Sequence, residues 1–89
     1  MPVVSFTRAL ERFLTTPRLE VEAATLGDAL AAVFATHPAL RGYVLDDQGA
    51  LRRHVAAYVN GQPASDRIHL SDPVGAGDEI YLLQALSGG

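Results

Sequence analysis

The feature that most constrains the fold is one amphipathic helix in the first half of the chain. Thr25-Leu26-Gly27-Asp28 is typical of a helix start, since the Thr25 hydroxyl can accept an amide hydrogen bond and the Asp28 carboxylate can return one. Apolar side chains follow at helical spacing on one face, with a histidine at the end: Leu26, Leu30, Val33, Phe34 and His37. Pro38 then ends the helix, because the residue before a proline is disfavoured in the α region. The pattern predicts a helix over residues 26–37 whose apolar face needs a sheet to cover.

Two strands are expected before this helix. Val3-Val4-Ser5-Phe6 is short, β-branched and aromatic, and Leu19-Glu20-Val21-Glu22-Ala23 alternates apolar with acidic residues. The segment between them, residues 7–18, has some helical spacing but closes quickly at Pro17, so we expect a loop with at most a turn or two of helix. The two strands are predicted to form an antiparallel hairpin.

Further strands are expected after the helix. Residues 39–42 are predicted as a connecting loop and residues 46–49 as a turn. His54 to Val59 reads as a strand that ends at the turn dipeptide Asn60-Gly61, and Ile68-His69-Leu70 as a short apolar edge. A last strand, residues 79–83, follows the turn at 75–78.

This order of elements predicts an α+β fold. A helix between strands of one sheet requires a crossover connection, and the compact solution is a mixed sheet of four to five strands packed on one main helix. That arrangement is the β-grasp, or ubiquitin-like, fold. With 89 residues and 9.5 kDa, the chain is predicted to be a single domain over 1–89, with a flexible C-terminal tail over 84–89.

Composition narrows the possible chemistry. The chain has no cysteine, and all seven of its basic residues are arginine, so cysteine nucleophiles, thiolate metal sites and lysine-linked polymers of the chain are excluded. The net charge is −3, and no segment is basic enough for a nucleic-acid interface. We predict no membrane span and no signal peptide, and hence a cytoplasmic protein. A carrier or binding module is favoured over an enzyme.

Metal and phosphate sites are not expected. His37, His54 and His69 are spaced 17 and 15 residues apart in different elements, which does not resemble a ligand cluster. Gly75-Ala76-Gly77 superficially resembles a phosphate-binding loop. Because no helix is predicted after it, we predict a hairpin turn instead.

The C-terminal Gly88-Gly89 pair is the most informative short motif. Because glycine lacks Cβ, such an end can enter a narrow channel and leaves the terminal carboxylate unhindered. A protein that must present this carboxylate to another protein needs both properties. The alternative is a frayed end without a role.

The whole pattern resembles the MoaD/ThiS sulfur-carrier family, which includes the small subunit of molybdopterin synthase, the thiamine sulfur carrier and a carrier of cysteine synthesis. The resemblance covers nearly the whole chain and rests on five stretches: Val4 to Leu10, Thr25 to Leu30, Leu51 to Gly61, Gly77 to Ile80 and Ala85 to Gly89. The chain departs from the family at Gln84, where many family tails have a proline. A second departure is the segment 39–53, which is longer than in the compact thiamine carriers. This length favours the molybdopterin-synthase and cysteine-route branches.

The resemblance implies a mechanism and a set of partners. An E1-like adenylyltransferase would use ATP to adenylate the Gly89 carboxylate, a persulfide donor would replace AMP to leave a thiocarboxylate, and an acceptor enzyme would take the sulfur. Gly88 would keep the tail slim. An apolar docking patch would be formed by Leu86, Leu82 and Tyr81. The alternative for these three residues is core packing. The protein itself would bind no cofactor. Two other functions stay open: a β-grasp interaction domain without cargo, and a protein modifier joined through Gly89.

Overall fold

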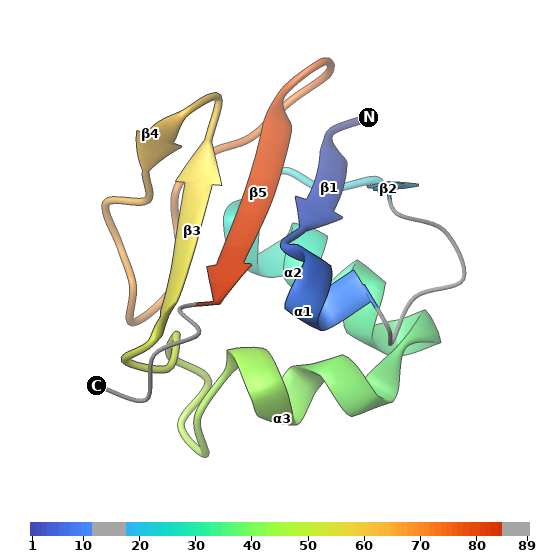
Figure 1. Cartoon of the computed structure of the whole chain (residues 1–89). Helices are drawn as coiled ribbons and strands as arrows, with labels where there is room; N and C mark the ends of the chain where they lie inside the picture. The colour runs from blue at the N-terminus through green and yellow to red at the C-terminus, as the bar shows by residue number, and fades with distance from the viewer. Residues whose placement is uncertain (12–17, 85–89) are drawn as a thin grey trace.

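The computed structural model describes residues 1–11 and 18–84 of the chain (Figure 1). Its strands are β1 (Val3–Phe6), β2 (Arg18–Glu20), β3 (Val55–Val59), β4 (Gln62–Pro63) and β5 (Glu79–Gln84). Its helices are α1 (Arg8–Glu11), α2 (Leu26–Thr36), the 3-10 helix η1 (Pro38–Leu40) and α3 (Arg41–Val44). The strands form one sheet in the order β2-β1-β5-β3-β4.

The sheet is mixed, as the sequence predicted. β1 and β2 form the expected antiparallel hairpin, with Val4 opposite Leu19. β5 lies in the centre, parallel to β1 and antiparallel to β3. The first and last strands of the chain are therefore neighbours, and this brings Ser5 beside Tyr81.

The main helix has the predicted cap. The Asp28 amide donates to Thr25 Oγ1 over 3.1 Å, which satisfies one of the free amides of the first turn. α2 ends at Thr36, one residue before the predicted end, and the His37 amide closes it by donating to the Val33 carbonyl. The helix passes behind β1 and β5 in Figure 1 and covers one face of the sheet.

The prediction of a loop over residues 39–42 is wrong, since η1 and α3 make this stretch helical. Pro38 stands in the first turn of η1, where its missing amide costs nothing. Leu40 and Val44, one turn apart, are both fully buried. Burial of these two side chains accounts for a helical path that the local sequence did not indicate.

The segment 68–70 is a turn rather than the predicted strand edge. Asp66 organises it: its carboxylate accepts hydrogen bonds from the Ile68 and His69 amides and from Ser71 Oγ, the last over 2.6 Å. Leu70 has a φ of 55° and is buried in the core. Its carbonyl accepts the Gly27 amide, so this loop seals the start of α2.

Strand β5 continues through Gln84, one residue beyond the strand predicted over 79–83. The burial of β5 alternates along its length, with Ile80 and Leu82 in the core and Glu79, Tyr81 and Leu83 exposed. The sheet consequently has a covered face and an open face. The rest of the predicted tail, residues 85–89, lies outside the described residues.

Candidate functional site

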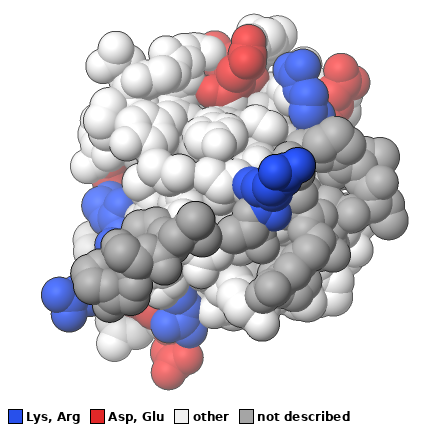
Figure 2. Space-filling view, in the orientation of Figure 1, with Lys and Arg blue, Asp and Glu red and all other residues white. Residues whose placement is uncertain are grey.

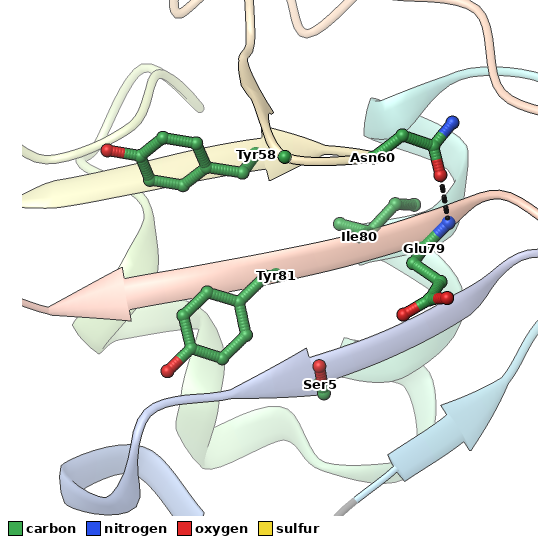
Figure 3. A pocket seen from close by; sticks show the side chains of 7 residues that line it. Ser5, Tyr58, Asn60, Glu79, Ile80 and Tyr81 are labelled. Carbon is green, nitrogen blue, oxygen red and sulfur yellow. Dashed lines mark hydrogen bonds between the residues drawn. The ribbon is translucent and has the colours of Figure 1, made fainter.

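The open face of the sheet carries a row of side chains from its three central strands. The strand register places Ser5 of β1 beside Tyr81 of β5, and Tyr81 opposite Tyr58 of β3. These residues line a hollow of about 680 Å³ together with Asn60, Gly61, Glu79 and Ile80. Figure 3 shows the two tyrosine rings side by side, with Asn60 and Glu79 at the other end of the hollow.

Asn60 holds the β3–β4 turn to the start of β5. Its Nδ2 donates to Asp78 Oδ1, and its Oδ1 accepts the Glu79 amide, each over 2.9 Å. Asn60 and Gly61 have φ values of 52° and 82°, the left-handed conformations that an Asn-Gly hairpin turn requires. The hydrogen bond from Asn60, followed by one from the Gly75 amide, lowers the pKa of the Asp78 carboxyl. The sequence indicated the turn but not this bond, which joins residues 18 apart.

Of the three residues predicted to form a docking patch, Tyr81 lies on the open face with 40% of its surface exposed. The prediction for Leu82 is wrong: this side chain is fully buried, because neighbouring residues of a strand point to opposite faces. Leu83, which is 36% exposed, points out on the same side as Tyr81 and was missed. Leu86, Gly88 and Gly89 lie outside the described residues.

The end of β5 is held from both sides. Gln84 is opposite Val55 of β3, and its amide donates to Thr7 Oγ1 over 3.2 Å. The Thr7 amide in turn donates to the Leu82 carbonyl over 2.9 Å. The sheet therefore fixes the point from which the chain continues to Ala85.

Other sites considered in the sequence have ordinary structural roles. Gly77 has a φ of 81° and the Gly75 amide donates to Asp78 Oδ2, so the glycine-rich segment is the predicted turn. Within residues 1–11 and 18–84, no three histidine or acidic side chains are placed to hold a metal ion. In the same ranges, no helix is both long and apolar enough to cross a bilayer.

Comparison with known proteins places this geometry in a family. The model of the ThiS family matches residues 7–89. Small archaeal modifier protein 1 of Haloferax volcanii is 41% identical over 75 residues, which are 83% of this chain and 82% of that protein. A crystal structure of the same Haloferax protein superposes with a TM-score of 0.80 at 34% identity, covering 99% of this chain and 98% of the other.

Another solved structure shares the fold at lower identity. In the crystal structure of the Amycolatopsis orientalis BexX/CysO complex, one chain matches with a TM-score of 0.87 at 23% identity over 100% of both chains. The chain therefore belongs to the ThiS family of small, non-catalytic, ubiquitin-like carrier proteins, and its five-stranded sheet and main helix form the β-grasp fold.

Proposed function

We propose that this protein is a sulfur carrier whose cargo is held on the C-terminal Gly89 carboxylate. The observation that carries the proposal is the family match, which extends through residue 89 and so includes Gly88-Gly89. Five residues, Ala85 to Gly89, follow the anchored end of β5. In this proposal they act as a slim tail on a single β-grasp domain, and Gly88 lets the tail enter a narrow channel.

The proposed chemistry takes place in partner enzymes. A carboxylate oxygen of Gly89 attacks the α-phosphorus of ATP on an E1-like adenylyltransferase, and pyrophosphate leaves. The terminal sulfur of a persulfide donor then attacks the acyl carbon, and AMP leaves with the bonding electrons. A second thiol cleaves the resulting acyl disulfide and is itself oxidised to a disulfide, which leaves a thiocarboxylate on Gly89. An acceptor enzyme takes this sulfur. The chain contributes the carboxylate and the docking surface but neither cysteine nor a bound cofactor.

We infer that the partners dock on the open face of the sheet, which leads directly to the tail. Tyr58, Tyr81 and Leu83 supply large, partly exposed side chains there. Leu83 precedes Gln84 on β5, so the docking surface and the start of the tail are adjacent along one strand. Aromatic side chains of this kind are enriched among residues that dominate binding energy. Leu86 extends this surface in the proposal.

The acceptor belongs to a route of the molybdopterin-synthase type or the cysteine-synthesis type. This finer part of the proposal rests on the segment 39–53, whose length favoured these branches. In the structure this segment includes the end of η1, all of α3 and the Leu45–Leu51 bridge. An acceptor that is encoded beside this protein would identify the route.

A second function is favoured by one specific observation. The chain is 41% identical to a protein named as a modifier, which suggests that Gly89 is also joined to amines of other proteins. Such conjugates would not extend into chains through the side chains of this protein, because it has no lysine.

Intact-mass spectrometry of the protein co-expressed with its E1-like enzyme and sulfur donor tests these functions. A carrier gains mass equal to the replacement of one oxygen by sulfur, and deletion of Gly89 abolishes the gain. Substitution of an exposed residue away from the tail, such as Glu22→Gln, should leave it intact. A ladder of larger covalent species favours the modifier. If the protein gains no mass although the activating enzyme is competent, the carrier function is wrong. The remaining alternative is then an interaction domain that carries no cargo.

A further inference from the structure

A second hollow lies beside the end of β5, separate from the one that the tyrosines line. It has a volume of about 190 Å³ and is lined by Arg53, His54, Val55, Ala56, Arg67 and Leu83. The register places Ala56 opposite Leu83, and Val55 opposite Gln84. This Arg53–Arg67 hollow is therefore next to the point where the chain leaves the sheet. An enzyme that binds the chain immediately after Gln84 would lie close to it.

The main chain holds one of the two arginines in place. Arg67 Nη2 donates to the Arg52 carbonyl over 2.7 Å, and the Arg67 carbonyl accepts the Leu51 amide over 2.9 Å. Arg52 is itself fixed, since its Nε donates to the Gly42 carbonyl over 2.7 Å. Arg67 is half-buried, whereas Arg53 and His54 are exposed. The half-buried guanidinium has lost side-chain freedom before any partner binds, which lowers the entropic cost of binding.

The charge of the hollow contrasts with that of the protein. The chain has a net charge of −3, yet no ion pair joins Arg53 or Arg67 to a carboxylate in the described part of the chain. Asp66 directly precedes Arg67, but its carboxylate accepts hydrogen bonds from the Ile68 and His69 amides and from Ser71 Oγ, and it does not line the hollow. Asp46 and Asp47 line a different hollow together with Arg52. At the lower left of Figure 2, blue and red side chains lie near one another, so basic and acidic groups share this side of the molecule. An approaching acidic side chain would be attracted to the two guanidinium groups that line this hollow.

We propose that the Arg53–Arg67 hollow binds acidic side chains of the activating enzyme, at the rim of the channel that receives the tail. A carboxylate fits a guanidinium in two parallel hydrogen bonds, and the exposed surface of Leu83 with Ala56 offers an apolar floor for its aliphatic stem. This inference rests on the proposed function. It adds that charge interactions at Arg53 and Arg67, together with apolar docking, orient the carrier so that its tail enters the enzyme in one direction.

ATP–pyrophosphate exchange by the adenylyltransferase of the same organism tests the inference, with the full chain as substrate over a range of NaCl concentrations. Arg53→Glu should raise the KM for the carrier about tenfold at low salt, and the difference should shrink at high salt as screening weakens the charge interaction. The KM for ATP should not change. Arg53→Lys keeps the positive charge but loses the bidentate geometry. Its KM for the carrier should lie between that of the wild type and that of Arg53→Glu. Arg41→Glu is the matched control, because Arg41 is exposed and does not line the hollow.

The outcomes separate this inference from the proposed function. If the wild type supports exchange that depends on Gly89, but Arg53→Glu stays within twofold of Arg41→Glu, the hollow is not a partner site and the carrier function stands. A raised KM for ATP in Arg53→Glu would also overturn the inference, since it would assign the hollow to nucleotide phosphate. If no Gly89-dependent exchange occurs with the wild type, the carrier proposal itself fails.

Discussion

Tyr58 of β3 and Tyr81 of β5 lie directly opposite each other in the antiparallel pair, on the face of the sheet that is turned away from α2. Pairs of aromatic side chains on neighbouring strands stabilise a sheet, but here the rings also border a hollow of about 680 Å³. Tyr81 keeps 40% of its surface exposed, and this part of the side chain is available to a partner.

Truncation of Tyr81 should therefore weaken partner binding more than it weakens the fold. We expect Tyr81→Ala to raise the KM for the carrier in adenylate formation about tenfold, the loss typical of a hot-spot side chain. Ile68→Ala is the control, because Ile68 is 62% exposed and does not line the hollow. Equal KM values for the two variants would argue against docking on this face.

Leu82 should behave in the opposite way. It is fully buried between the sheet and the helices, so Leu82→Ala should lower the free energy of unfolding by about 2–5 kcal/mol through lost transfer energy and a cavity. Leu83→Ala, one residue along, removes the same atoms from a partly exposed position and should cost much less. Urea denaturation followed by circular dichroism measures both; comparable losses would contradict the assignment of faces on β5.

Acid should destabilise the protein in part through Asp66. Hydrogen bonds from Ser71 Oγ and from the His69 amide lower the pKa of the Asp66 carboxyl to about 2, against 3.8 for the free side chain. Between these values the unfolded chain binds a proton that the folded chain does not, so the contribution of Asp66 to stability is complete above about pH 4 and is lost as the pH falls towards 2.

Asp66→Asn removes this titration. Its free energy of unfolding should be lower than that of the wild type at neutral pH, and the gap should close between about pH 4 and 2. Asp47→Asn, at an exposed position, serves as the control. Asp78, whose pKa is also lowered, contributes an acid-dependent loss of the same sign, which both variants retain. If the difference in free energy of unfolding between the wild type and Asp66→Asn stays constant over this pH range, the charge of the Asp66 carboxylate does not contribute to stability.

Asn60 should tolerate glycine better than alanine. Both substitutions remove the bonds to Asp78 and Glu79, but only alanine must also hold a φ of 52°, so Asn60→Ala should be about 1 kcal/mol less stable than Asn60→Gly. Thermal unfolding of the two variants beside the wild type measures this order. If alanine is the more stable, the left-handed backbone at residue 60 is not maintained in solution.

The sequence by itself determined the features that depend on neighbouring residues. The cap at Thr25, the extent of α2, the Asn60-Gly61 turn and the last strand all follow from local patterns of period, capping and turn chemistry. Each was predicted to within a residue or two. The mixed sheet packed on one main helix was also predictable, because a helix between strands of one sheet allows few arrangements.

Only the tertiary structure decided which face of β5 is buried. Alternation distinguishes two faces without saying which one meets the helices, so Tyr81 and Leu82 could not be separated until the sheet was packed against α2. The same is true of Arg67, which lies beside Arg53 because the loop after β4 returns its side chain to the Arg52 carbonyl, 15 residues away in the chain. Contacts between distant residues depend on the packing of the whole domain, and no local pattern carries them.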